Sequence, residues 1–277
     1  MDLVWLHGIL YGFLVGVAEF LPVSSESHSR VLAEMTGLSD AYLLFAITAR
    51  IACIVALILS CWPQIAKLRR ESRIAAIPPK RRKRQPDLNS LKDIRLIKSA
   101  LVLPVVGLGV SIVLPDWCHS IPTMILLTIV NGILLYLPPY YPAGNKNSQR
   151  VSMLDGILIG LGGALATLPG ISRISGFTCV GLLRGCDRQY ILNIALILSI
   201  PLLLLLLLLD VITFAMAGTA ISLLLIIGCV LCGLAAFAGA YFSIILLRFL
   251  SVKAGFSGFA YYSWGLALFA LILYLAI

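Results

Sequence analysis

The chain has 277 residues, of which 60% are apolar and only 12% are charged, and its mean hydropathy is +1.02. Soluble globular domains do not approach this composition, so the sequence predicts an integral membrane protein. The formal net charge is +9, and twelve of the 21 Lys and Arg residues lie between Lys67 and Lys98. A basic segment between membrane spans favours attraction to anionic lipid headgroups on the cytoplasmic side over a nucleic-acid partner.

The apolar runs, of roughly 16 to 25 residues, suit α-helices that cross a bilayer of about 30 Å. The sequence lacks the alternation of apolar and polar residues that is typical of outer-membrane barrels. Residues 3–20 also lack a basic leader and a small-residue cleavage site, so we do not expect a signal peptide. We expect an all-helical membrane protein with six transmembrane helices, at residues 41–62, 99–114, 121–138, 189–209, 219–247 and 256–277.

Two further apolar segments, residues 3–35 and 154–186, are each interrupted by polar residues that include a proline. We expect each to form a re-entrant helix pair, which enters and leaves the membrane on the same side. One such element followed by three spans occurs twice, in residues 1–138 and 154–277. Because three crossings is an odd number, the two halves would form an inverted repeat within a single membrane domain, residues 1–277.

The distribution of charge predicts the orientation. If the basic loop, residues 63–98, is cytoplasmic, then 18 of the 21 basic residues lie inside. The positive-inside rule therefore predicts a multi-pass protein of the cell membrane whose two termini are external. The loops left outside contain acidic residues but no Lys or Arg, and they lie near residues 36–40, 115–120 and 210–218.

A first polar break interrupts the apolar run near residue 20. From residue 19 its sequence is Glu-Phe-Leu-Pro-Val-Ser-Ser-Glu-Ser-His-Ser-Arg. Pro22 ends or kinks the first helix, and Ser24, Ser25 and Ser27 can each cap the helix that follows. The free N–H groups at the start of that helix would then point into the break, and helix amino termini bind phosphate.

His28 lies in the same break and brings acid–base chemistry to it. A neutral imidazole can accept or donate a proton near pH 7, or attack phosphorus. Glu19 or Glu26 can fix its tautomer. These groups, together with a cation and hydroxyls, are what the hydrolysis of a phosphoanhydride requires.

The second polar break begins at residue 169 with Pro-Gly-Ile-Ser-Arg-Ile-Ser-Gly-Phe-Thr. Pro169 and Gly170 stop one helix, and Ser172 begins the next. Arg173 follows at once, and its planar, permanently charged fork makes it the strongest candidate for a phosphate clamp. Hydroxyls on the two breaks supply further donors or an alternative nucleophile: Ser25, Ser27, Ser172, Ser175 and Thr178.

A structural interpretation of these residues is the alternative. A His or Arg inside a membrane can simply pair with a neighbour, and Ser or Thr hydroxyls commonly bond back to their own helix. Arg50 lies in an otherwise apolar span, where an unpaired guanidinium is costly, so it needs a partner, most simply Glu19 or Glu26. His7 and His119 lie near the ends of expected spans, which favours an interfacial position.

Three stretches of the chain carry a resemblance: Glu19-Phe-Leu-Pro-Val-Ser-Ser-x-x-His28, Leu168-Pro-Gly-Ile-Ser-Arg173 and Val180-Gly-Leu-Leu-Arg-Gly-Cys-Asp-Arg188. They resemble the undecaprenyl-pyrophosphate phosphatase family associated with bacitracin resistance, over the whole length of the chain. The resemblance implies a membrane hydrolase that removes the terminal phosphate of a polyprenyl diphosphate and recycles the lipid carrier of cell-wall peptidoglycan synthesis. It also implies re-entrant helix pairs in an inverted repeat, and carboxylates that bind a divalent cation, Mg²⁺ or Ca²⁺.

The first motif departs from the family pattern, which has two glutamates four residues apart. The second of these is Glu19, but the first position holds Val15, and Ser27 replaces a glycine. Glu26, at a variable position, is a hypothetical replacement for the missing carboxylate. Arg50 stands where the family usually has a neutral side chain or an imidazole.

The second motif departs as well, because Ile174 is in effect inserted before Ser175. Alignment without a gap places Ile174 and Phe177 on the Ser and Thr of the family. A slip of one residue instead places Ser175 and Thr178 on the Ser and Thr of the family. A slip rotates side chains by about 100° on a helix, so the two alignments are not equivalent.

We therefore expect a polyprenyl-diphosphate phosphatase in which Arg173 clamps the phosphate and His28 handles the proton or attacks phosphorus. Ser25 and Ser172 would line the pocket or supply the nucleophile, and Glu19 would orient His28 or hold a cation. Rival interpretations are a transporter or flippase, and a relative that binds lipid phosphate without hydrolysis. The expected partners are the lipid and the membrane, with a homodimer left open. The expected substrate-binding residues are Ser24, Ser27, Glu26, Gly170, Ser175, Thr178 and Arg50.

Overall fold

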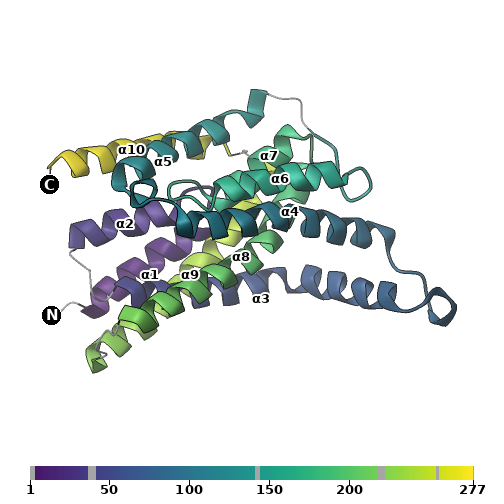
Figure 1. Ribbon diagram of the computed structural model, residues 1–277, viewed down its shortest axis with the longest axis horizontal. Coiled ribbons are helices and arrows are strands. Elements are labelled where there is room, and N and C mark those ends of the chain that lie inside the picture. Colours follow the sequence, from purple (N-terminus) through teal and green to yellow (C-terminus); the bar gives the residue numbers. More distant parts are fainter. Residues whose placement is uncertain (1–3, 37–41, 141–143, 218–221, 254–255, 277) are drawn as a thin grey trace.

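The computed structural model describes residues 4–36, 42–140, 144–217, 222–253 and 256–276 (Figure 1). Most of the expected outer loop near residues 36–40, and the expected span ends at 41, 219 and 277, fall outside these ranges. The α-helices are α1 (Val4–Phe20), α2 (Ser25–Thr36), α3 (Tyr42–Ala76), α4 (Leu88–Val113), α5 (Ile121–Tyr136), α6 (Met153–Leu165), α7 (Arg173–Leu183), α8 (Arg188–Ala217), α9 (Leu223–Lys253) and α10 (Gly258–Ala276). Short 3₁₀ turns are η1 (Pro79–Arg81), η2 (Asp116–His119) and η3 (Pro138–Tyr140).

Six of these helices are long and apolar enough to cross a membrane, namely α3, α4, α5, α8, α9 and α10. The helices α1, α6 and α7 are also apolar but shorter. Together with α2 they form the two interrupted elements, with breaks at the expected prolines. The all-helical, multi-pass membrane fold that hydropathy predicts is confirmed.

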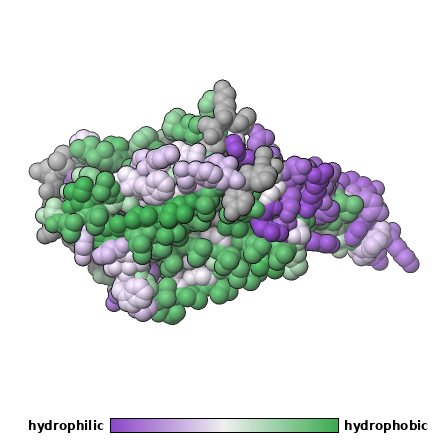
Figure 2. Space-filling model, turned by 90° about the horizontal axis from the view of Figure 1, so that it is seen from above, coloured by the Kyte–Doolittle hydropathy of each residue, from purple (hydrophilic) through white to green (hydrophobic). Residues whose placement is uncertain are grey.

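The basic segment is a helical hairpin and not the long loop that was expected at residues 63–98. Helix α3 continues to Ala76 and α4 already begins at Leu88, because Lys, Arg and Glu are good helix formers once the apolar part has started the helix. The hairpin projects from the apolar body, with the hydrophilic surface at its end (Figures 1 and 2). Asp87 caps α4 and pairs with Lys67 at 3.0 Å, and these bonds lower the pKa of Asp87 to about 2.

Helix α1 is packed closely against α9. Three glycines of α1 face the α9 backbone so closely that a Cβ atom on any of them would overlap a carbonyl oxygen; they are Gly8, Gly12 and Gly16. Small residues spaced by four let helix backbones approach each other inside a membrane, where the hydrophobic effect does not drive helix association. This glycine face fixes α1, and therefore the start of the first break, against the second half of the chain.

The two halves pack on each other reciprocally. The short helix α1 packs on α9, and its counterpart α6 packs on α4; α5 contacts α10, and α3 contacts α8. Each short helix therefore packs on the middle span of the opposite half. This arrangement agrees with the repeat of elements along the chain, while the opposite orientation of the halves in the membrane stays a prediction.

The two polar breaks meet, as we expected from the sequence. Ser172 donates from Oγ to the carbonyl oxygen of Leu21 at 3.2 Å, and Ser175 donates to that of Pro22 at 3.0 Å. Asn131 of α5 bridges the breaks, since it donates to the Pro22 carbonyl at 3.3 Å and accepts from the Ser172 backbone N–H at 3.0 Å. Helix α1 begins, and α10 ends, at the end of the molecule that is far from the basic hairpin (Figure 1).

Candidate functional site

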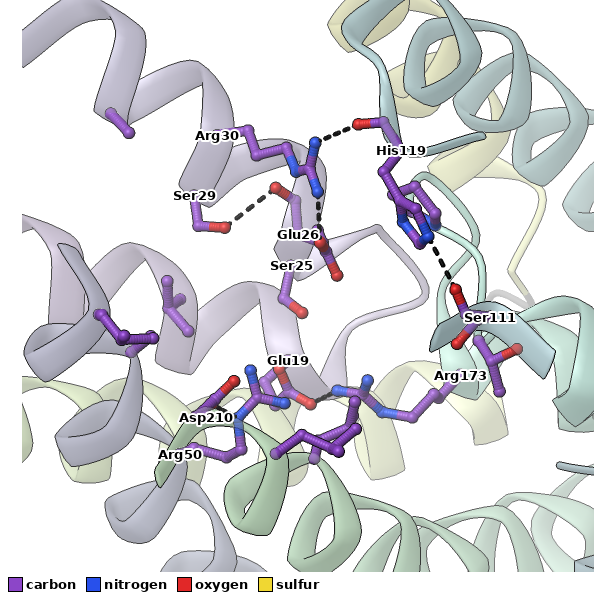
Figure 3. A pocket seen from close by; sticks show the side chains of 18 of the residues that line it. Glu19, Ser25, Glu26, Ser29, Arg30, Arg50, Ser111, His119, Arg173 and Asp210 are labelled. Carbon is purple, nitrogen blue, oxygen red and sulfur yellow. Dashed lines mark hydrogen bonds and ion pairs between the residues drawn. The ribbon is translucent and has the colours of Figure 1, made fainter. Parts of the chain in front are cut away.

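A cavity of about 810 Å³ lies beside the contact between the two breaks. It is lined by the second half of α1, one face of α2, the first turns of α3, the last turns of α4, the start of α5 and α7, and residues 206–210 of α8. His119 of η2, and Thr167 and Pro169 of the second break, complete the lining. The cavity therefore lies in the part of the membrane body away from the basic hairpin. Its ionisable and hydroxyl-bearing lining residues are Tyr11, Glu19, Ser25, Glu26, Ser29, Arg30, Arg50, Ser111, His119, Thr167, Arg173 and Asp210. Figure 3 labels ten of them.

Arg173 reaches this cavity from the first residue of α7. Ser172 caps that helix, and its side chain accepts the backbone N–H of Ser175. The guanidinium forms an ion pair with Glu19, which lies in the last turn of α1. The side chains of Arg173 and Glu19 are only 15% and 7% exposed. The pair therefore joins the two breaks and keeps a cation at the cavity wall, as the sequence predicts for Arg173.

Arg50 forms a second ion pair with a partner that the sequence analysis did not identify. Its Nε lies 2.8 Å from Oδ2 of Asp210, so the expected pairing with Glu19 or Glu26 is wrong. Asp210 does not belong to an outer loop, because α8 continues as a helix to Ala217 and carries it into the cavity wall. Asp210 follows a run of eight leucines, and an acidic residue in such a run indicates a buried cationic partner.

A third group of charges lies on the opposite side of the cavity in Figure 3. Glu26 and Arg30 form an ion pair at 3.1 Å on α2, and Arg30 also donates to the backbone carbonyl of His119 at 2.5 Å. The His119 Nε2–H donates to the carbonyl of Ser111 at 2.9 Å. His119 therefore lines the cavity, where the sequence suggested only an interfacial position.

His28 does not line the cavity. The Ser24 carbonyl lies 2.6 Å from its Nδ1, and because a carbonyl only accepts, Nδ1 carries the proton. In the neutral ring Nε2 is then free to accept from the hydroxyl of Tyr262, 2.7 Å away on α10. The rings of His28 and Tyr262 are also stacked, with centroids 5.7 Å apart. The expected meeting of His28 and Arg173 around one ligand is therefore absent from this arrangement, and the part of His28 in catalysis stays a prediction.

Helical geometry explains why α2 divides its polar residues between two faces. Side chains advance by about 100° per residue, so residues one, four and five positions apart share a face. Ser25, Glu26, Ser29 and Arg30 follow this spacing and line the cavity. Residues on the other face are buried against the protein: Ser24, Ser27, His28 and Val31.

The other expected binding residues are also outside the cavity lining. Ser24 accepts the Ser27 backbone N–H at 3.2 Å as the cap of α2, and the Ser27 hydroxyl hydrogen-bonds with that of Thr128 at 2.9 Å. Thr178 donates to the carbonyl of Ile174. Ser172 and Ser175, described above, hold the first break.

Gly170 has a structural role that only glycine can fill. Its φ of +110° lies in a region that other residues rarely adopt, and a Cβ atom there would be 2.6 Å from the carbonyl oxygen of Met124. Neither alignment of the second motif gives a hydroxyl at the cavity, since Ile174, Ser175, Phe177 and Thr178 are all fully buried.

The fold and the site together define a multi-pass membrane protein with a charged cavity at the contact of two helix breaks. The chain belongs to the family of the bacitracin resistance protein BacA, whose family model matches residues 8–269. It is 30% identical to an undecaprenyl-diphosphatase of Carboxydothermus hydrogenoformans over 96% of both chains. Proteins of the same name from a Nocardioides species and from Micrococcus luteus are 27% and 28% identical, over 71% and 72% of this chain and 71% of each relative.

Proposed function

We propose that this protein is a membrane phosphatase that removes the terminal phosphate of undecaprenyl diphosphate, which recycles the lipid carrier of cell-envelope synthesis. The names of the relatives support this reaction over transport or lipid binding without hydrolysis. The observation that carries the proposal is the buried Arg173–Glu19 pair at the wall of a cavity inside the membrane body. A guanidinium held in a poorly solvated site stabilises the charge that develops on a transferring phosphoryl group.

In this proposal Arg173 binds the terminal phosphate and Glu19 holds its guanidinium in place. An oxygen nucleophile forms a bond to the terminal phosphorus while the bond from that phosphorus to the bridging oxygen breaks. The bridging oxygen leaves on undecaprenyl phosphate. If the nucleophile is water, the terminal group leaves directly as inorganic phosphate. If it is a serine hydroxyl, a water molecule then hydrolyses the phosphoserine, which releases inorganic phosphate and restores the hydroxyl. The prenyl tail would lie among the lipids, where its apolar surface favours binding without contributing to specificity.

Ser25 is the hydroxyl that we propose at the reacting end. It begins α2 and lines the cavity, so it can attack phosphorus or orient the attacking water. His28 stabilises the same helix start on the face that points away from the cavity. Its Nδ1 bonds the Ser24 carbonyl, and its Nε2 bonds the Tyr262 hydroxyl. We propose that His28 positions this turn, and that its contribution to proton transfer is indirect.

The test is release of phosphate from undecaprenyl diphosphate by the purified protein in detergent. The wild type should release phosphate, and Arg173→Ala should lose most of the activity while it elutes as a single folded species. Arg69→Ala, at an exposed position of α3 in the basic hairpin, is a matched control that should keep wild-type activity. Absence of release from a folded wild type would contradict the proposal, and transport or lipid scrambling in proteoliposomes would then be measured.

We also propose that the basic hairpin is cytoplasmic and that the cavity opens on the outer side. The clustering of basic residues supports this orientation. Alkaline phosphatase fused to the C-terminus should be active, and green fluorescent protein at the same place should stay dark. The homodimer that the sequence analysis left open can be tested by light scattering of the detergent complex.

A further inference from the structure

We infer that hydrolysis in this protein proceeds without a divalent cation, and that Arg50, positioned by Asp210, supplies the charge that a cation would bring. The inference rests on the proposed phosphatase function, and it concerns how that site neutralises its substrate. Three observations on the cavity carry it: the pairing of its carboxylates, the residue at position 15, and the donors left on Arg50.

The carboxylates of the cavity are already paired with arginines. Among the residues that the structure describes, three carboxylates line it, and each forms an ion pair with a different arginine. Mg²⁺ is usually bound by one or two carboxylates together with substrate phosphates and water. A guanidinium beside each carboxylate repels such an ion, and it already pairs with one of the two carboxylate oxygens. In the described ranges no group of three His, Cys, Asp or Glu side chains is arranged to hold a metal ion.

The residue at position 15 is a valine, where the family pattern implies a second carboxylate. Val15 lies one helical turn before Glu19 on α1, on the same face, and it lines the cavity. A glutamate there would give two carboxylates side by side, which suits a cation. A valine leaves Glu19 alone with Arg173. The residues present therefore do not fit the divalent cation that the resemblance implies.

Arg50 has donors to spare for a phosphate. A guanidinium carries five N–H donors, and the shortest contact with Asp210 joins Nε to one carboxylate oxygen at 2.8 Å. One carboxylate has two oxygens, so it cannot use all five donors. In the view of Figure 3, Glu19 lies between the guanidinium groups of Arg50 and Arg173. Two arginines, each paired with one carboxylate, therefore line the same cavity, where a diphosphate has two groups to neutralise.

The first experiment measures phosphate release from undecaprenyl diphosphate after exhaustive treatment with EDTA. The wild type should stay within about twofold of its rate in Mg²⁺ or Ca²⁺, since no ion takes part in the reaction. Arg50→Ala should lower the rate at least about tenfold, because a charge-assisted contact is lost. Arg50→Ala leaves Asp210 without its partner and can unfold. Arg50→Gln combined with Asp210→Asn removes both charges and leaves no unpaired carboxylate, and it should show the same loss of rate. The control is Arg69→Ala, which should behave as the wild type under both conditions.

The second experiment needs no turnover. Mn²⁺ titrated into the wild type and followed by electron paramagnetic resonance should show no stoichiometric site that Glu19→Gln removes. Such a site would overturn the inference, as would a wild type that EDTA inactivates and Mg²⁺ or Ca²⁺ restores. Both results would leave the phosphatase function standing. A folded wild type that releases no phosphate with or without a cation would overturn the function and this inference together.

Discussion

The two polar breaks contain similar residues but contribute differently to the site. The break before α2 presents a face of four polar side chains to the cavity, Ser25, Glu26, Ser29 and Arg30. The break before α7 presents one charged side chain, Arg173, and directs its hydroxyls to the carbonyls of the first break. The first break is therefore mainly a binding surface, and the second supplies one cation and holds the first in shape. Similar motifs in a repeat do not imply equal roles.

The largest effect should come from the one charge that the second break gives to the cavity. Arg173→Ala should lower kcat/KM for phosphate release by about 100- to 1000-fold, as expected when a preorganised charge on the transition state is lost. Arg173→Lys should recover only part of this, because an ammonium lacks the planar fork. A loss below tenfold in the alanine variant would mean that another residue binds the phosphate.

A hydroxyl of the first break should affect activity more than stability. Ser25→Ala should lower kcat about 10- to 100-fold if the hydroxyl attacks or orients water, with the free energy of unfolding changed by less than about 0.5 kcal/mol. The measurement pairs initial rates with thermal unfolding in detergent. An unchanged rate would show that the nucleophile is a water molecule placed by other groups.

His28 should act through its neighbours, which gives a matched pair of variants. His28→Ala and Tyr262→Phe should lower kcat by similar factors, about 5- to 20-fold, because each removes a support of the α2 start. The pH profile of kcat should keep its shape in Tyr262→Phe. If His28→Ala abolishes turnover while Tyr262→Phe is nearly wild type, the imidazole takes part directly in the chemistry.

A hydroxyl of the second break, that of Ser175, should affect stability more than activity, the reverse of Ser25. Ser175→Ala should lower the free energy of unfolding by about 0.5 to 1.5 kcal/mol, because the buried carbonyl of Pro22 loses one of its two donors and keeps Asn131. Activity measured well below the unfolding temperature should fall by less than about threefold. Differential scanning fluorimetry in detergent gives the stability, and a stable but inactive variant would argue against the division of roles.

The smallest effect should come from Glu26. Its pair with Arg30 is half exposed, with side chains 51% and 29% accessible, and such pairs contribute little. Glu26→Gln should change the rate of phosphate release by less than about twofold, because no cation needs this carboxylate as a ligand. A loss of tenfold or more would mean that Glu26 replaces the carboxylate missing at position 15.

The sequence predicted the helices and the meeting of the breaks, because long apolar runs and buried prolines leave few alternatives in a membrane. It did not predict the helical hairpin, since charged helix formers extend α3 past the end of its apolar run. The sequence also did not predict on which face of α2 His28 lies. That face depends on which serine caps α2, and three candidates were available; with Ser24 as the cap, His28 turns away from the cavity.

The partner of Arg50 could have been predicted. Asp210 is an acidic residue at the end of a leucine run, and a buried cation elsewhere in the chain needed a carboxylate. We placed it in a loop because hydropathy falls at Asp210, although the helix continues to Ala217. Where a charge is paired inside the membrane, the drop in hydropathy does not mark the end of the helix.

The packing of α1 on α9 has a consequence for biosynthesis. The first helix leaves the ribosome early, but the surface that covers its glycines is synthesised about 200 residues later. At roughly 5–20 residues per second this delay is on the order of 10–40 s. During that interval the nascent first half stays in the bilayer or at the insertion machinery without its final neighbour. A chain that stops after α8 should therefore be recognised as incomplete and degraded.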